Sequence, residues 1–239
     1  MDWLLSPIEQ TARRGIFRLT RRKEFRRWQR LRNVEDPNSY SLLPLIRRRC
    51  IFVHVPKCAG TSLCRQLFGS QGPGHVRIKD YQVALSVREF SHFFKFTIVR
   101  NPWDRLVSAF HFLEAGGMNR MDREWASLNI SRFQDFDEFV HEWVNSDNVN
   151  DGSYFHFRPQ VSFVRLASGV IPLDFIGRTE SLDDDIAEVC SHLQIPQVKL
   201  RKHNVSHHEP YQNLYTKDTR AIVERVYAED IKIFDYKFD

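Results

Sequence analysis

A run of apolar, largely β-branched residues that leads into a tight turn and a helix start most constrains how this chain folds. Residues 51–55 predict a buried β-strand, since a strand covered on both faces is apolar along nearly its whole length. Residues 56–60 predict a turn. Residues 61–68 predict a helix that begins with the hydroxyl of Thr61 as its cap and ends at Gly69. A strand that passes directly into a helix is typical of folds with parallel sheets.

The same strand-then-helix order recurs along the chain. Residues 94–99 and 173–177 predict two more buried strands, and Asn101 predicts the cap of a helix whose first residue is proline. This alternation indicates an α/β fold with a parallel sheet. Helical patterns also cover residues 8–31, 81–90, 136–144, the segment after Ser181, and 217–228.

The turn at residues 55–62 carries the groups that an anion site requires. A helix N-terminus offers free N–H groups and a partial positive charge, which favour phosphate or sulfate. Lys57 adds a full charge, and Gly60 lets the backbone approach an anion closely. The candidate ligands of this first anion segment are Pro56, Lys57, Cys58, Ala59, Gly60, Thr61 and Ser62.

The first anion segment departs from the phosphate loop of Walker A nucleotide-binding proteins. That loop has its lysine directly after the second glycine, whereas Lys57 precedes the single Gly60. No predicted strand ends in an aspartate suited to holding magnesium, so we expect no metal site. The open alternative is an ordinary turn between a strand and a helix, with Lys57 as a surface charge.

A second candidate anion segment follows residues 94–99. Arg100 comes at the carboxyl end of that predicted strand, where ligands bind in open parallel sheets. Ser108 lies about two turns into the next helix and could face the same side as Arg100. An arginine fork with a hydroxyl suits a terminal phosphate. The alternative is that Asp104 and Arg105 are surface charges and Ser108 packs inside.

Charge is distributed unevenly along the chain. Residues 1–50 hold 13 Lys and Arg against 5 Asp and Glu, a net of +8 within the total of +5. The remaining residues hold 22 basic and 25 acidic side chains, a net of −3. We therefore expect a basic amphipathic extension over residues 1–49 and a folded domain over residues 50–239.

Composition bounds the class of protein. With 42% hydrophobic residues among 239, the chain can bury a sizeable core. The four cysteines form no C-x-x-C pair, which argues against a zinc site or a disulfide framework. No apolar run reaches the ~18 residues of a membrane span, and the apolar start is too short for a signal peptide. These features predict a cytoplasmic protein with reduced thiols.

With both anion segments in order, the chain resembles the sulfotransferases that use 3′-phosphoadenosine-5′-phosphosulfate (PAPS), in the branch of the carbohydrate sulfotransferases (sulfotransferase family 2 type). The first anion segment is similar to the family's P-K-x-x-G/C-[ST] loop. Arg100-Asn101-Pro102, followed by Arg105 and Ser108, is similar to its R-[ND/E]-P-x-x-R-x-x-S segment. The resemblance covers about residues 50–239.

The resemblance implies a P-loop-like three-layer fold, with a central parallel sheet flanked by helices. It implies an enzyme that transfers the sulfuryl group from PAPS to a hydroxyl of a carbohydrate or related acceptor and releases adenosine 3′,5′-bisphosphate. The first anion segment would hold the 5′-phosphosulfate, and Arg100 and Ser108 the 3′-phosphate. Arg158-Pro159-Gln160 resembles the family's acceptor-side segment and is called the acceptor segment here. The resemblance implies substrate contacts from Arg158, Gln160 and His156.

The implied reaction needs a general base, because a hydroxyl is a poor nucleophile near neutral pH. Lys57 would stabilise charge on the leaving oxygen. Gly74-His75-Val76 resembles the Gly-His-Val segment of uronyl 2-O-sulfotransferases, which implies His75 as the base. His156 and Glu114 are the other candidates, and a solvent-exposed loop histidine is the alternative for His75.

Two other functions stay open at this stage: a P-loop-like small-molecule kinase, and a module that binds a membrane or a partner protein through the basic N-terminus. Nucleic acid is not expected as a partner, since residues 51–239 are net acidic. The animal Golgi members of the family are type II membrane proteins. The lack of a span here therefore predicts a bacterial cytoplasmic enzyme with peripheral membrane contact, or a chain without its anchor.

Overall fold

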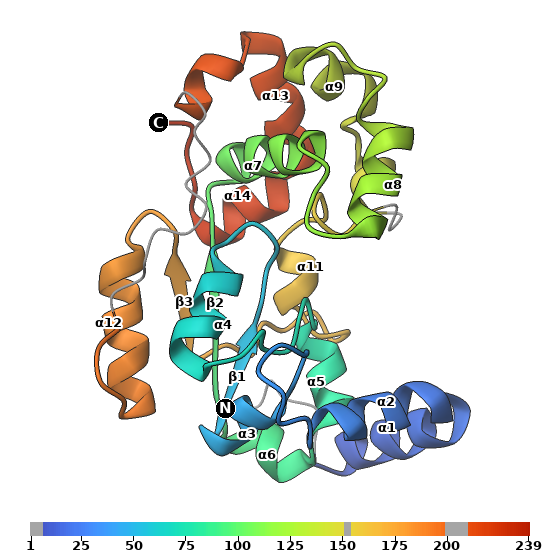
Figure 1. Cartoon of the computed structure of the whole chain (residues 1–239), viewed down its shortest axis with the longest axis vertical. Helices are drawn as coiled ribbons and strands as arrows, with labels where there is room; N and C mark the ends of the chain where they lie inside the picture. Colours follow the sequence, from blue (N-terminus) through green and yellow to red (C-terminus); the bar gives the residue numbers. More distant parts are fainter. Residues whose placement is uncertain (1–6, 151–153, 199–209) are drawn as a thin grey trace. The chain divides into compact units, whose positions relative to one another are not determined.

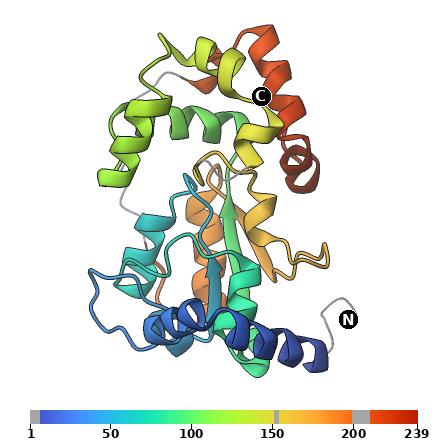
Figure 2. The same ribbon diagram turned by 90° about the vertical axis from the view of Figure 1, so that its right-hand side faces the viewer.

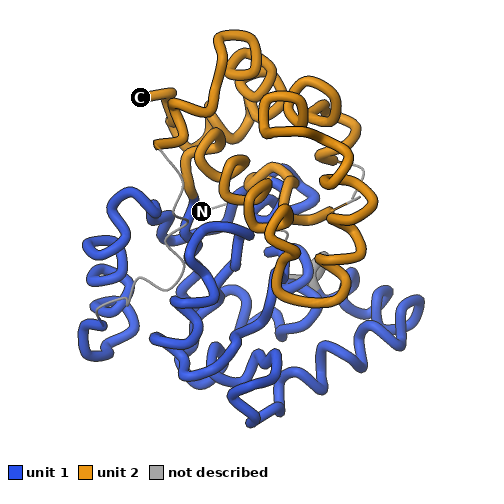
Figure 3. The backbone as a smooth tube through the Cα atoms, turned by 45° about the horizontal axis from the view of Figure 1, so that its top comes forward, with its two compact units in different colours: residues 1–99, 162–203 blue, residues 100–161, 204–239 orange. Residues whose placement is uncertain are grey.

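The chain folds in two units, whose backbones are coloured separately in Figure 3. The computed structural model describes residues 7–150, 154–198 and 210–239. Unit 1 consists of residues 1–99 and 162–203, and unit 2 of residues 100–161 and 204–239. Each unit has its own packing.

A sheet of three parallel strands lies at the centre of unit 1 (Figures 1 and 2). The described strands are β1 (Cys50–Val53), β2 (Phe94–Val99) and β3 (Phe175–Arg178), in the spatial order β1-β2-β3. Phe52 pairs with Phe96, and Phe96 with Phe175. Every residue of β1 is buried, as expected for a strand covered on both faces. The predicted α/β fold with a central parallel sheet is confirmed.

Helices of unit 1 are fixed to this sheet by specific contacts. Tyr81 donates a hydrogen bond to the carbonyl of Phe52 in β1 (2.7 Å). Gly177 of β3 is closely packed, since an added Cβ would lie 2.6 Å from Ile98 of β2 and 3.0 Å from Asp185 of α12. The described helices are α1 (Pro7–Thr20), α2 (Arg22–Leu31), α3 (Leu43–Arg47), α4 (Gly60–Phe68), α5 (Ile78–Ala84), α6 (Val87–His92) and α12 (Leu182–Leu193), with α11 (Val161–Val164) at the unit boundary.

Several predicted helices in unit 1 have different bounds. The helix predicted over residues 8–31 is two helices, α1 and α2, which meet at Arg21 in a non-helical conformation and lie side by side (Figure 1). The helix predicted over residues 81–90 is also divided, because Ser86 caps α6 in a capping box with Glu89. Ser181 precedes α12, but its hydroxyl donates to Asp185 and does not cap the backbone.

Unit 2 is helical and has an aromatic core. Phe110, Phe139, Trp143 and Phe157 are among its buried members. Asn101 accepts a hydrogen bond from the N–H of Trp103, which confirms the predicted cap. The described helices are α7 (Pro102–Glu114), α8 (Arg120–Asn129), α9 (Phe136–Trp143), α10 (Ser146–Asn150), the 3₁₀ helix η1 (Tyr211–Leu214), α13 (Lys217–Val226) and α14 (Ala228–Phe234).

Some helices of unit 2 were not predicted from the sequence. One is α8, which Asn119 caps by accepting the N–H of Asp122. The final predicted helix, residues 217–228, ends earlier and is followed by α14. In the part of the chain that the structure describes, no helix combines the length and the apolar character needed to cross a membrane.

Candidate active site

The first anion segment adopts a backbone conformation that non-glycine residues rarely take. Lys57 has a φ of 68° and Ala59 a φ of 58°, both in the left-handed region. This conformation costs roughly 1–2 kcal/mol per non-glycine residue. Strain of this kind is concentrated at functional sites, and alternating backbone conformations can turn successive N–H groups toward an anion.

Helix α4 begins in this segment without a side-chain cap. Its N-cap residue is Ala59, whose methyl group cannot accept a hydrogen bond, so the predicted hydroxyl cap at Thr61 is wrong. Thr61 and Ser62 instead lie in the first turn, half-buried, and no other described residue bonds their hydroxyls. Uncapped N–H groups, two hydroxyls and the half-exposed Lys57 together make a donor set suited to a phosphate or sulfate.

Pro56 and Cys58 contribute in a different way. Both are buried, and the Cys58 thiol donates to the carbonyl of Pro56 (3.5 Å). Their side chains therefore shape the turn from inside, and Pro56, which has no backbone N–H, offers no donor to an anion.

Gly60 is required by its neighbour His54. A Cβ at Gly60 would lie 2.0 Å from Cδ2 and 2.2 Å from Nε2 of His54, whose ring is buried and stacked on Phe52. The sequence suggested Gly60 only as a point of close approach for an anion. His54 was not identified from the sequence, although it is the residue that leads from β1 into the turn.

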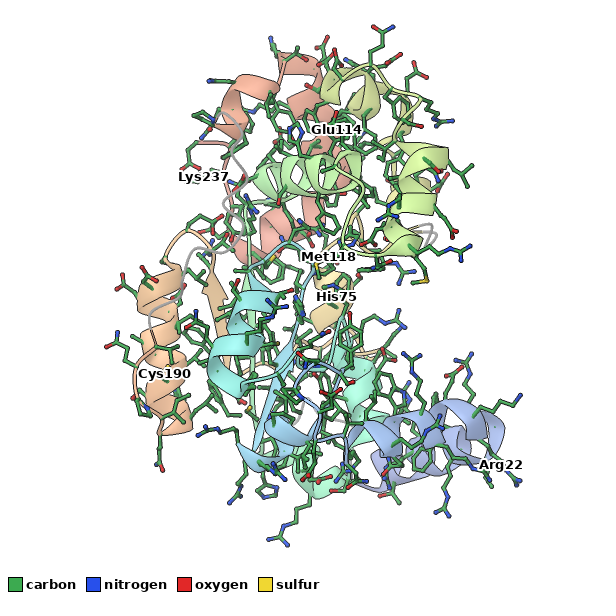
Figure 4. The ribbon with its side chains drawn as sticks, viewed as in Figure 1. Arg22, His75, Glu114, Met118, Cys190 and Lys237 are labelled. Atoms are coloured by element: carbon green, nitrogen blue, oxygen red, sulfur yellow. The ribbon has the colours of Figure 1, made fainter. Side chains whose placement is uncertain are left out.

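His75 is oriented by the backbone of His54. Its Nδ1 lies 3.0 Å from the carbonyl oxygen of His54, and the two rings are 4.2 Å apart. A carbonyl can only accept, so the neutral imidazole carries its proton on Nδ1 and a lone pair on Nε2. His75 is half-buried (Figure 4). This tautomer is the one that a general base acting through Nε2 requires.

The loop that carries His75 is held by residues of the predicted N-terminal extension. Gln71 donates to the carbonyls of Pro37 (3.1 Å) and Asn38 (2.6 Å), and Ser41 donates to the carbonyl of Gly72 (2.8 Å). Leu42 is also buried in unit 1. The domain boundary at residue 50 stays a prediction, but residues 37–42 make contacts with the folded part of unit 1.

The second anion segment begins unit 2, directly after β2. The guanidinium of Arg100 donates to both carboxylate oxygens of Asp104, at 2.7 and 2.8 Å, which fixes its plane. Ser108 is buried in α7, and its hydroxyl has no partner among the described residues. An oriented guanidinium and an unpartnered hydroxyl match the donors predicted for a terminal phosphate.

Arg105 is not the surface charge that one interpretation of the sequence suggested. Its side chain is 1% exposed and donates to the carbonyls of His156 (3.0 Å) and Arg158 (2.6 Å). Its guanidinium also lies over the ring of Tyr227, 5.7 Å from the centroid. Arg105 therefore fixes the backbone of the predicted acceptor segment, a role that no sequence pattern indicated.

Gln160 connects this acceptor segment to Arg100. Its amide accepts from the N–H of Arg100 (3.0 Å) and donates to the carbonyl of Arg100 (2.8 Å). Gln160 is fully buried, and Asp230 accepts its backbone N–H (2.7 Å) and that of Val161 (2.9 Å). These contacts make Gln160 a positioning residue for Arg100. Arg158, by contrast, is half-buried.

The two other candidate bases have different surroundings. His156 is buried and faces Asp122, with 3.8 Å between Nε2 and Oδ1, and Tyr154 donates to the same carboxylate. Burial alone would raise the pKa of Asp122, but the bonds from His156 and Met118 lower it. Glu114 is half-exposed and pairs with His111 at 2.9 Å. Both of these candidates belong to unit 2.

No group of three His, Cys, Asp or Glu side chains among the described residues is arranged to hold a metal ion. The four cysteines are buried and none forms a disulfide. Burial raises the pKa of the Cys50 thiol to about 12, so this thiol stays protonated near neutral pH and packs as an apolar core group.

Comparison with known proteins agrees with this arrangement. Searches among curated proteins and among solved structures gave no match. A family model described as "Sulfotransferase family" matches residues 47–237, which include both anion segments and His75. Because the match spans most of its length, the chain belongs to the sulfotransferase family and is a sulfotransferase.

Proposed function

We propose that this sulfotransferase takes the sulfuryl group from PAPS and transfers it to a hydroxyl of a carbohydrate. The observation that carries the proposal is the strained turn before α4, where Lys57 and Ala59 have positive φ values and no side chain caps the helix. An anion bound at this turn would accept hydrogen bonds from N–H groups that no side chain caps and would stabilise the strained backbone.

The donor's two charged ends are assigned to the two anion segments. Lys57, the N–H groups of the first turn of α4, and the hydroxyls of Thr61 and Ser62 would bind the 5′-phosphosulfate. Arg100 and Ser108 would bind the 3′-phosphate, with Asp104 and Gln160 holding Arg100 in place. Support comes from the donor chemistry of each segment and from the family match over both.

The proposed reaction is a direct in-line transfer. The acceptor oxygen forms a bond to sulfur as the bond between sulfur and the 5′-phosphate oxygen breaks. The acceptor proton passes to Nε2 of His75, whose Nδ1–H bonds to the carbonyl of His54. Lys57 stabilises the charge that develops on the leaving phosphate oxygen. The products are a sulfate ester and adenosine 3′,5′-bisphosphate.

A carbohydrate is the proposed acceptor for two reasons. Arg158-Pro159-Gln160 resembles the acceptor-side segment of the carbohydrate sulfotransferases. Hydrogen bonds to Arg105, Tyr227 and Asp230 also hold the backbone at and beside this segment, whereas Arg158 itself is partly exposed. A fixed backbone that carries a half-buried arginine suits a polar or acidic saccharide.

Transfer of ³⁵S from labelled PAPS to a panel of saccharides and non-saccharide alcohols tests the proposal. Label should appear on at least one saccharide with the wild type, and Lys57→Ala should abolish the transfer. Lys79→Ala, which alters an exposed lysine of α5, is the matched control and should retain activity. Label transferred only to non-saccharide hydroxyls would contradict the acceptor assignment. Equal activity in Lys57→Ala would contradict the role of the turn.

A further inference from the structure

The N-terminal hairpin, defined as α1 and α2 (residues 7–31), is docked on unit 1 by its inner face. Arg14 donates to the carbonyl of Val83 (3.2 Å), and Gln29 donates to that of Ala84 (3.0 Å). Just beyond α2, Arg32 forms a two-bond ion pair with Glu89. Both helices pack against α5 (Figures 1 and 2). The hairpin therefore has a fixed outer face.

The outer face of α1 is apolar. Ile16 is 61% exposed and Leu19 is 66% exposed, and Ala12 is also exposed. The steps of three and four residues between them put the three side chains on one side of the helix. Exposed large aliphatic side chains grouped in this way mark an interaction surface. We call Ala12, Ile16 and Leu19 the apolar ridge.

Basic side chains surround the apolar ridge. Arg22 extends outward at the turn between the two helices (Figure 4). Over residues 11–31 the only acidic side chain is Glu24, which pairs with Arg21 at 3.2 Å. The exposed basic residues of the hairpin are Arg13, Arg18, Arg21, Arg22, Lys23, Arg26, Arg27 and Arg30.

We propose that the N-terminal hairpin docks on a bilayer that contains anionic lipids, with the apolar ridge at the level of the acyl chains and the basic residues among the headgroups. A second copy of this chain would bring two sets of like charges together. A soluble polyanion would match the charge but would leave Ile16 and Leu19 in water. An anionic bilayer matches both the apolar ridge and the basic residues around it. This inference does not depend on the proposed donor or acceptor.

Vesicle co-sedimentation of the full chain tests the proposal. The protein should pellet with phosphatidylcholine vesicles that contain phosphatidylglycerol, much less with phosphatidylcholine alone, and less as salt increases. Ile16→Ser/Leu19→Ser should weaken binding by about tenfold or more. Arg22→Gln/Arg26→Gln/Arg27→Gln should do the same. The matched control is Met121→Ser/Leu128→Ser on α8, where the exposed fractions are 68% and 76%, and it should bind like wild type.

Two results would overturn the proposal. Equal binding to both vesicle types would show that charge plays no part. Undiminished binding of the ridge variant, together with loss of binding in the arginine variant, would show a purely electrostatic surface for a soluble polyanion. Circular dichroism confirms that each variant is folded before it is scored, and all the substituted positions are exposed.

Discussion

The Nδ1 atom of His75 donates a hydrogen bond to the backbone carbonyl of His54, the residue that joins β1 to the first anion segment. The candidate base and the first anion segment are thus connected through the backbone of one residue, His54. This relationship has consequences for kinetics that differ from those of a surface histidine.

His75→Ala should lower kcat by roughly 10²–10⁴-fold and leave the affinity for PAPS nearly unchanged, because the base acts only on the acceptor proton. The acidic limb of the wild-type pH–rate profile should disappear in the variant. Steady-state kinetics as a function of pH, with donor binding measured separately, checks both statements.

His92→Ala is the matched control for His75. Its Nδ1 also bonds a backbone carbonyl, that of Arg88 (2.9 Å), but the side chain is exposed on α6. This variant should keep wild-type kinetics. If His75→Ala retains more than about a tenth of wild-type kcat with its acidic limb intact, His75 is not the base, and His156 and Glu114 are tested next.

Gly60→Ala should destabilise the protein by about 1–3 kcal/mol, although alanine is the better helix former, because its Cβ would overlap the ring of His54. In a His54→Ala background the same substitution should cost little. Urea unfolding of the four proteins in this double-mutant cycle measures the coupling. Equal costs in both backgrounds would show that the ring does not set the requirement for glycine.

Arg100→Ala should weaken binding of adenosine 3′,5′-bisphosphate by about 2–4 kcal/mol, since the 3′-phosphate loses a charge-assisted partner. Ser108→Ala should cost about 1 kcal/mol, the value of one hydrogen bond. Isothermal titration measures both. Arg120→Ala, which breaks an exposed arginine–glutamate pair of the same i,i+4 spacing, should have no effect.

A nucleotide that lacks the 3′-phosphate distinguishes loss of the 3′-phosphate contact from a general loss of nucleotide affinity. Arg100→Ala should bind adenosine 5′-monophosphate as well as the wild type does. A uniform loss with both nucleotides would assign Arg100 to some other part of the donor.

Glu89 couples stability to pH. Partial burial by itself would raise its pKa, but bonds from Arg32 and Ser86 lower the pKa from 4.5 to about 2. A lowered pKa in the folded state adds stability above about pH 4.5, and that stability is lost as pH falls toward 2. Glu89→Gln should therefore cost about 1–2 kcal/mol at pH 7, allowing for solvent screening, and progressively less below pH 5.

Urea unfolding at a series of pH values checks this prediction. The control is Glu35→Gln, whose partner Arg47 is 2.8 Å away but where both side chains are mostly exposed. It should change stability little at any pH. A constant cost for Glu89→Gln from pH 7 to pH 3 would mean that the ion pair is not responsible.

The parallel sheet and the start of α7 were predictable because their signals are local. β2 consists of aromatic and β-branched residues apart from Lys95, and Asn101 followed by Pro102 is a strong helix start. The end of β1 was less predictable. Its pairing with β2 stops at Val53, so residues 54 and 55 have strand-like composition without a partner strand.

The supporting residues of the site could not be predicted because their contacts are distant in sequence. Arg105 bonds carbonyls more than 50 residues away, and an arginine in a helix is usually exposed. The contact between His54 and Gly60 depends on positive φ values at Lys57 and Ala59, which composition does not signal. In the N-terminal hairpin, the helical period was visible, but the periodicity gave no indication that Ile16 and Leu19 face outward.

Isothermal titration in the presence of a chelator tests the central claim most directly, that the turn at Lys57 binds the phosphate end of a PAPS-type donor without metal. The account predicts that adenosine 3′,5′-bisphosphate binds to the wild type in the chelator and that Lys57→Ala binds it more weakly. It also predicts that ATP with magnesium binds less tightly than the bisphosphate. Tighter binding of magnesium–ATP, with no measurable affinity for the bisphosphate, would contradict the account and favour a kinase.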